Sequence, residues 1–176
     1  MNRSIQDALG YQLPKPNPAQ RMLRSAASSR PGAWVFARIA PPLDKLVLRR
    51  TGGRTGMADI LTAVPVLTLV TTGARSGLTR TSALLGIPHG DAIALIGTQF
   101  GQPGTPSWYF NLTAHPVAEL RYRDRSVAVT AREAAGAEWD AAWRRACDVY
   151  PGYAAYARRI QGRRIHIMVL TATATE

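Results

Sequence analysis

Six short apolar runs separated by turn residues limit what this chain can fold into. From residue 65 on, the runs are PVLTLVT, RTSALLGIP, DAIALIGT, VAELRY, RSVAVTAR and RRIHIMVLT. Each has the length of a β-strand, and tight turns such as PHGD (88–91) favour antiparallel pairing of neighbours. A helical stretch over 136–149 precedes the last run. We therefore predict an α+β fold, a small closed or split antiparallel β-barrel with flanking helices.

The first third of the chain has a different composition. Residues 1–32 are rich in Pro, Ser, Asn and Gln, and we interpret them as a loosely ordered arm with a short helical candidate over 18–27. Residues 33–50 have an apolar side and a basic side, so they either cap the edge of the core or rest on a membrane surface. We accordingly divide the chain into an arm with a basic amphipathic segment, 1–56, and a barrel domain, 57–176.

Charge and cysteine content narrow the partners and the compartment. The chain of 176 residues has a formal net charge of +11, and only Lys15 and Lys45 are lysines, so arginine supplies nearly all of the basic charge. Such a surface attracts polyanions: nucleic acid, acidic lipid or an anionic cofactor. With Cys147 as the one cysteine and no apolar run of membrane-spanning length or secretory signal, we expect a cytoplasmic protein. The basic segment leaves open a peripheral place at the inner face of the cell membrane.

The sequence has few of the motifs that bind metals or supply a catalytic nucleophile. His89, His115 and His166 are far apart in the sequence and stand in different local contexts. The chain has no cysteine pair, no HExxH and no G-x-S-x-G. We therefore expect no metal site.

Three segments could carry chemistry. In TTGARSGLTR (71–80), two glycines let the backbone curl after a strand while Arg75 and Arg80 flank the turn. This is either a site for a phosphate or carboxylate or a polar hairpin with solvated arginines. In GTQFGQPGTPSWYFNLTAHP (97–116), a glycine-rich loop leads into a helix start. At least one of its three consecutive aromatic residues should point outward, where a flat ring could pack.

The third segment is YPGYAAY (150–156). Tyr150, Tyr153 and Tyr156 recur at helical spacing, so their rings fan across one side of a helix that Pro151 would begin. The phenols either line an apolar cavity or fill the core.

In this order, the segments resemble the deazaflavin-dependent nitroreductase family, split-barrel oxidoreductases of mycobacteria and their actinobacterial relatives that use coenzyme F-420 (F420). The family pattern is roughly TTGRxSGxxR, a glycine-rich loop, PxWYxNLxAxP and YPxYxxY. Here those read TTGARSGLTR, GTQFGQPG, PSWYFNLTAHP and YPGYAAY, and the match spans about 65–170.

The resemblance implies a set of site residues. The turn would hold the phosphate and acidic oligoglutamate tail of the coenzyme, while the following strand, the loop and the helix start would wall the deazaflavin. The implied coenzyme-binding residues are Ala74, Arg75, Ser76, Gly77, Arg80, Thr81, Ser82, Leu84, Leu85, Ile96, Gly97, Thr98, Gln99, Ser107, Trp108, Tyr109 and Asn111. The implied catalytic residues are Tyr153, nearest the substrate, with Tyr150, Tyr156 and Thr98.

Some positions depart from the family pattern. Ala74 stands where a basic residue is common, Gln99 and Phe100 stand where small residues or glycine are usual, and His115 replaces an asparagine. The loss of one tail contact at Ala74 and a narrower substrate pocket at Phe100 are the expected consequences.

The function implied by the resemblance is hydride transfer from reduced F420 to a quinone, an enone or a nitro compound. A lipid quinone would give the 33–50 segment a purpose at a membrane. Two alternatives remain: an FMN-binding split-barrel oxidoreductase, and a non-enzymatic basic barrel that binds single-stranded nucleic acid. The aromatic residues lie in a loop and a helix start rather than along strands, so we expect no nucleic acid as partner. The oligomeric state stays open.

Overall fold

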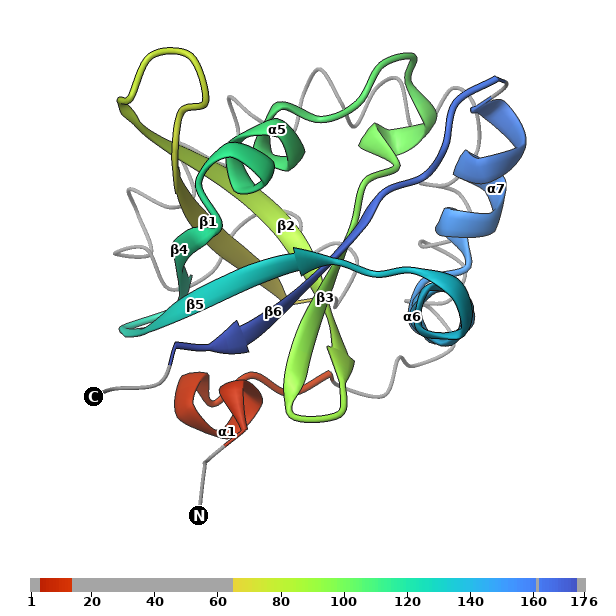
Figure 1. The fold of residues 1–176 in the computed structure, drawn as a ribbon. Coiled ribbons are helices and arrows are strands. Elements are labelled where there is room, and N and C mark those ends of the chain that lie inside the picture. The colour runs from red at the N-terminus through yellow and green to blue at the C-terminus, as the bar shows by residue number, and fades with distance from the viewer. Residues whose placement is uncertain (1–3, 14–64, 161, 174–176) are drawn as a thin grey trace, which may run out of the picture.

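The computed structural model describes residues 4–13, 65–160 and 162–173. Figure 1 shows a small barrel of strands with helices at its ends and on one side. The strands are β1 (Val66–Thr72), β2 (Thr79–His89), β3 (Ala92–Ile96), β4 (Val117–Tyr122), β5 (Arg125–Glu133) and β6 (Ile167–Ala172). The helices are α1 (Ile5–Leu9), the 3-10 turn η1 (Gln99–Gly101), α5 (Ser107–Ala114), α6 (Gly136–Val149) and α7 (Gly152–Arg159).

The strands close into a barrel in the order β1-β2-β3-β6-β5-β4, and every pair is antiparallel. The predicted fold class is therefore confirmed. The last strand begins at Ile167 rather than at residue 163, and a second helix, α7, follows α6 before it. The helix expected over 136–149 has those bounds in the structure.

Apolar side chains on the two faces of the strands form two separate hydrophobic clusters. Residues on the inner face of the barrel, such as Leu69, Leu95 and Leu170, form one cluster with side chains of α1 and α5. Residues on the outer face of β3 and β6, such as Ala94 and Val169, form a second cluster under α6 and α7. Helices α6 and α7 are thus needed because this part of the sheet is apolar on both faces.

Helix α1 closes one end of the barrel, which differs from the loosely ordered arm expected for residues 1–32. Ile5, Leu9 and Tyr11 are almost fully buried in the inner core. The Tyr11 hydroxyl donates to the carbonyl of Gly86 at 2.7 Å and lies 3.0 Å from that of Pro65. Burial of three such side chains contributes roughly 1.5–3 kcal/mol each. The helical candidate over 18–27, the 33–50 segment and the division at 56/57 lie outside the described residues.

The antiparallel order assigns each connection to one of the two ends. The β1–β2 turn (73–78), η1, α5 and the start of β4 share one end, which we call the upper end because Figure 1 shows it at the top. The β2–β3 hairpin, the β4–β5 hairpin and α1 share the other, lower end. Within the described residues, no helix is long and apolar enough to cross a membrane.

Candidate active site

The β1–β2 turn presents an exposed set of hydrogen-bond donors. Its backbone is closed by bonds from the N–H of Gly73 to the Leu78 carbonyl and from the N–H of Gly77 to the Gly73 carbonyl, both 2.8 Å. Gly77 has a φ of 66°, a left-handed conformation that glycine adopts readily. The backbone N–H groups of Arg75 and Ser76 have no hydrogen-bond partner among the described residues. Together with exposed guanidiniums, these donors fit a phosphate or carboxylate group.

Asn111 joins this turn to α5. The side chain is 8% exposed. Its Oδ1 accepts from the N–H of Ala74 at 3.0 Å, and its Nδ2 donates to Thr71 Oγ1 at 3.0 Å. The sequence predicted Asn111 as a contact of the coenzyme ring, and the structure gives its amide a place inside the protein that fixes the turn on the helix.

The predicted residues on β2 divide between the two faces of the strand. Ser82 pairs with Leu69 and Leu84 with Leu67, so Ser82 and Leu84 lie on the inner face. Thr81 lies exposed on the outer face, and Leu85 on that same face packs against the cluster under α6 and α7. Arg80 pairs with Thr71 and shares the face of Ser82 and Leu84. The outer face therefore runs from Thr81, beside the turn, to Leu85, beside the tyrosine cluster, over about 13 Å at ~3.3 Å per residue.

The loop after β3 is held in place by a residue that the sequence did not single out. Arg163 Nη1 donates to the carbonyl of Gly97 at 3.0 Å, and its Nη2 to that of Thr98 at 3.2 Å. Its Nε is buried with no partner, no carboxylate among the described residues pairs with it, and burial lowers the pKa of this guanidinium. Nothing in the sequence distinguishes Arg163 from the other arginines, because its role depends on a carbonyl 66 residues away.

The same loop is strained and rests on α7. Gln99 and Phe100 both have positive φ, 46° and 56°, where non-glycine residues are disfavoured. This explains in physical terms why glycine or small residues suit these positions. A Cβ on Gly101 would lie 3.3 Å from the Cα of Tyr156, so the loop backbone lies directly against the helix. The predicted loop and tyrosine segments are therefore in contact.

The three tyrosines of α7 and its N-terminal flank belong to the outer core. All are less than 10% exposed, and their rings meet edge to face or tilted at 5.7–6.4 Å. The Tyr150 and Tyr156 hydroxyls are 3.1 Å apart, whereas the Tyr153 hydroxyl has no hydrogen-bond partner among the described residues. Burial, together with the neighbouring Tyr150, raises the pKa of Tyr153 and of Tyr156. Both phenols therefore keep their protons at any physiological pH.

The aromatic residues at the start of α5 have different surroundings. Trp108 is 4% exposed within the inner core, whereas Tyr109 is half-buried. Tyr109 stacks on His166 at 4.0 Å between ring centroids and donates to Glu133 at 3.0 Å. Glu133 also contacts His166 Nδ1 at 2.8 Å. Burial raises the pKa of Glu133, but the hydrogen bonds with His166 and Tyr109 lower it by more. The net effect is a pKa below the usual value. Sequence reasoning missed this cluster because its members come from three distant segments.

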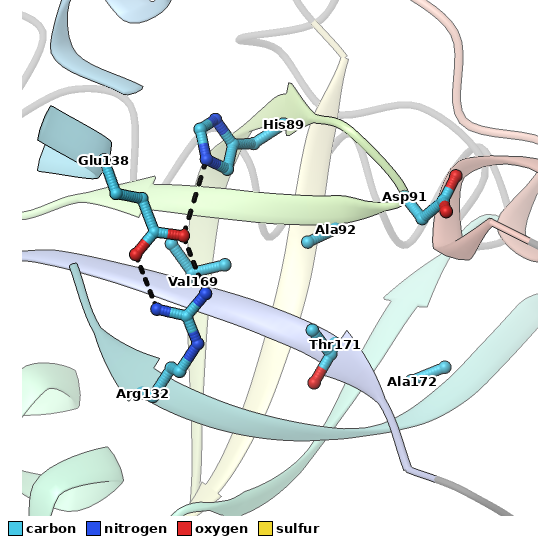
Figure 2. A pocket seen from close by; sticks show the side chains of 8 residues that line it. All are labelled: His89, Asp91, Ala92, Arg132, Glu138, Val169, Thr171 and Ala172. Carbon is cyan, nitrogen blue, oxygen red and sulfur yellow. Dashed lines mark hydrogen bonds and ion pairs between the residues drawn. The ribbon is translucent and has the colours of Figure 1, made fainter. Parts of the chain in front are cut away.

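A separate cavity of about 300 Å³ lies on the outer face of the barrel near the β2–β3 hairpin. Figure 2 shows Glu138 of α6 bridging Arg132 and His89 there. The bidentate pair spans 2.5 and 2.6 Å, and the His89 contact 3.7 Å. None of the predicted site residues lines this cavity. Among the described residues, no three histidine, cysteine or carboxylate side chains cluster as metal ligands.

The family model described as F420H(2)-dependent quinone reductase matches residues 43–172, which is most of the sequence. The chain belongs to this family. The resemblance to F420-dependent reductases is thereby confirmed.

Relatives of known sequence and structure agree with this membership. The F420H(2)-dependent quinone reductase of Mycobacterium tuberculosis (strain H37Rv) is 35% identical over 102 residues, which cover 56% of this chain and 68% of that one. A solved F420-H2 dependent reductase has a TM-score of 0.55 at 34% identity, over 60% of this chain and 93% of that chain. A second solved structure, described as a domain-swapped dimer, has a TM-score of 0.57 at 29% identity, over 80% of this chain and 98% of that chain.

Membership in the F420H(2)-dependent quinone reductase family has direct consequences. The protein is an F420-dependent oxidoreductase, and its cofactor is coenzyme F420. The activity that the family supports is the reduction of quinones.

Proposed function

We propose that this protein moves a hydride from reduced F420 to a lipophilic quinone, with the coenzyme tail at the β1–β2 turn and its ring over the outer face of β2 beside α7. The observation that carries this placement is the exposed outer face of β2. It leads from Thr81, next to the turn that carries Arg75, to Leu85, which packs in the cluster that holds the tyrosines. When bound, reduced F420 supplies the hydride.

The turn binds the tail through charge and backbone donors. Arg75 and Arg80 are exposed, and the backbone N–H groups of Arg75 and Ser76 in the same turn have no partner among the described residues. A charge-assisted hydrogen bond contributes roughly 1.5–3 kcal/mol when partly desolvated, and less on an exposed turn in salt. Because the tail has several carboxylates, several weak contacts together still give a substantial binding affinity.

Tyr153 is the proton-holding residue of the proposal. Because its pKa is raised, its hydroxyl can donate a hydrogen bond to a quinone oxygen and cannot act as a base at neutral pH. Tyr150 and Tyr156 are within hydrogen-bond distance of each other, whereas the Tyr153 hydroxyl has no partner among the described residues and can donate to the acceptor. The apolar cluster around the three rings would keep water away from the reacting atoms.

Enones and nitro-substituted rings belong to the proposed acceptor range as well. Each offers an electrophilic centre for the hydride and an oxygen that a phenol can hydrogen-bond. Phe100, 46% exposed with its ring 6.2 Å from that of Tyr156, lies where it would limit the size of the acceptor.

The test is an anaerobic assay of reduced F420 oxidation with purified protein, followed by absorbance, against menaquinone analogues, enones and nitroaromatics. We expect turnover with the quinones and slower turnover with the other two classes. Turnover with nitroaromatics or enones but with no quinone would contradict the proposed acceptor.

A further inference from the structure

Three consecutive carbonyl groups of the loop after β3 are engaged within the protein. The Gly97 carbonyl accepts from Arg163 Nη1 at 3.0 Å, and the Thr98 carbonyl accepts from Arg163 Nη2 at 3.2 Å. The backbone N–H of Gly101 also donates to the Thr98 carbonyl, at 2.9 Å, and the Gln99 carbonyl accepts another backbone N–H at 3.0 Å. The oxygens at 97, 98 and 99 therefore need no donor from a ligand.

The donors of the same loop lack such partners. Thr98 is 3% exposed, and its hydroxyl has no hydrogen-bond partner in the part of the chain that the structure describes. The backbone N–H groups of Gln99 and Phe100 have none within that part either. An unpartnered hydroxyl on a buried residue costs free energy, so the imbalance indicates an acceptor that comes from outside the chain.

The backbone of the loop has a shape that gathers N–H groups. Thr98 has right-handed φ and ψ of −85° and −19°, whereas Gln99 and Phe100 have positive φ. A right-handed residue followed by a left-handed one brings successive N–H groups together in a concave turn that binds negative oxygen. Because positive φ costs a non-glycine residue free energy, this shape depends on support from its surroundings.

Arg163 supplies that support together with a positive charge. None of the ion pairs among the described residues includes Arg163, and its Nε is buried without a partner. A guanidinium keeps its proton at physiological pH, so the charge persists although no carboxylate in that part of the chain balances it. The Thr98 carbonyl and the Gln99 N–H belong to one peptide group. A cation bound to the oxygen polarises this group and makes its N–H a stronger donor.

The loop lies beside the tyrosine cluster. A Cβ on Gly101 would be 3.3 Å from the Cα of Tyr156, and the ring of Phe100 is 6.2 Å from the Tyr156 ring. The loop that Arg163 holds is therefore next to the place where the quinone is proposed to bind.

We propose that Arg163 is a positioning residue for the reaction, which occupies the carbonyl groups of the loop and so presents Thr98 as a donor to a ring carbonyl oxygen. This rests on the proposed function, which places the coenzyme ring and the quinone beside α7. Both ring systems carry carbonyl oxygens. A quinone oxygen gains negative charge as the ring accepts the hydride, and donors that are fixed in advance stabilise this charge. Arg163 acts through Thr98 rather than by contact with either ring.

The first test uses the full-length protein without added coenzyme. Hydrogen exchange in peptides that cover 97–102 should be about tenfold faster in Arg163→Ala and in Arg163→Lys, because the Gly101 N–H loses its fixed acceptor. Lysine keeps the charge but cannot hold two carbonyls in a fixed geometry. Arg158→Met is the matched control, since Arg158 is exposed on α7, and it should exchange as the native protein does. Native exchange rates in both Arg163 variants would overturn the proposal.

The second test is steady-state kinetics with a water-soluble short-chain quinone. We expect Arg163→Ala to lower kcat about tenfold or to weaken the F420 dissociation constant by a similar factor, and guanidinium chloride to restore part of the loss where potassium chloride does not. In a Thr98→Val background the same change should cost much less, because the group through which Arg163 acts is already gone. Full additivity of the two changes, or an equal loss in Arg158→Met, would overturn the proposal.

Titration of F420 separates the two sources of the oxygen. A weaker dissociation constant in both Arg163→Ala and Thr98→Val assigns the oxygen to the coenzyme, whereas a native dissociation constant with a lower kcat assigns it to the quinone. Native values of both in Arg163→Ala would overturn the proposal. If the native protein binds F420 and reduces no quinone, the proposed function fails. Exchange and F420 affinity then decide the role of Arg163, and a native dissociation constant in Arg163→Ala would exclude it.

Discussion

The side chain of Asn111 holds the backbone of Ala74 at 3.0 Å, and so fixes the arginine turn on helix α5. The bond joins two elements that are 37 residues apart in the chain. Backbone hydrogen bonds close the turn on itself, and the Asn111 side chain ties it to the helix.

Replacing Asn111 by Ala should weaken both the fold and coenzyme binding. The change removes two buried hydrogen bonds, so we expect a loss of about 1–3 kcal/mol in unfolding free energy and a weaker F420 dissociation constant. Thr71→Val is the matched control, because it removes the Asn111–Thr71 bond and leaves the bond to Ala74. Urea unfolding and F420 titration should show Thr71→Val closer to native in coenzyme affinity. Equal losses of affinity in the two variants would show that the Ala74 bond does not position the turn.

Phe100 should tolerate glycine better than a β-branched residue. Its φ of 56° is strained for any side chain, and most of all for valine or isoleucine. Phe100→Gly should therefore change the melting temperature little, since relief of strain offsets the greater entropy of the unfolded chain. Phe100→Val should lower it by several degrees, which is about 1 kcal/mol.

The acceptor preference of the two Phe100 variants gives a second measurement. If Phe100 limits the pocket, Phe100→Gly should lower KM for bulky quinones relative to small ones. Identical relative rates across a series of quinone sizes in the native protein and in Phe100→Gly would remove Phe100 from the pocket.

Tyr153→Phe should slow turnover without unfolding the protein. The ring stays in place, and the lost group is the one phenol of the three that has no partner among the described residues. We expect kcat to fall about a hundredfold with a small change in quinone KM, as for removal of a positioned proton donor. Tyr150→Phe is the control, because it removes a hydroxyl that is within hydrogen-bond distance of Tyr156. A larger loss of kcat in Tyr150→Phe would move the donor role to Tyr150.

Some elements of the fold could be predicted from the sequence and others could not. The strands and α6 were predictable, because their apolar spacing and turn residues are local signals; the helix over 136–149 has the predicted bounds. Helix α1 was not, because the Tyr11 hydroxyl contacts carbonyls 54 and 75 residues away and its segment is otherwise polar and short. The loop and the tyrosine segment do meet at Gly101 and Tyr156.

For other site residues, the sequence does not determine which way the side chain points or what it contacts. A run of three aromatic residues required at least one to face outward, and the structure buries Trp108 while Phe110 is exposed. That choice depends on how α5 is rotated over the barrel. Arg163 and Glu133 could not be identified from the sequence, because the groups they contact are distant in the chain. Direct contact of the predicted residues with F420 stays a prediction.

The stability of the fold should fall in acid through Glu138. The hydrogen bonds from Arg132, which outweigh burial, hold the pKa of Glu138 below its usual value of 4.5. A carboxylate with a lowered folded pKa stabilises the protein above about pH 4.5, and this is lost as the pH falls through the folded value. Because Arg132 is 57% exposed, we expect about 0.5 kcal/mol or less at pH 7.

Urea unfolding between pH 3 and 7 checks this. Glu138→Gln should flatten the pH dependence, whereas Asp140→Asn on the same helix should not. A native protein whose stability rises as the pH is lowered below 4.5 would contradict the sign.

The central claim is that the arginine turn grips the coenzyme tail, and titration of F420 over a range of salt concentrations tests it most directly. For Arg75→Ala with Arg80→Ala we predict a dissociation constant about ten- to a hundredfold weaker and a flatter salt dependence, with Arg123→Ala, Arg125→Ala at the lower end close to native. An affinity and salt slope in the turn variant equal to those of the native protein would contradict the account.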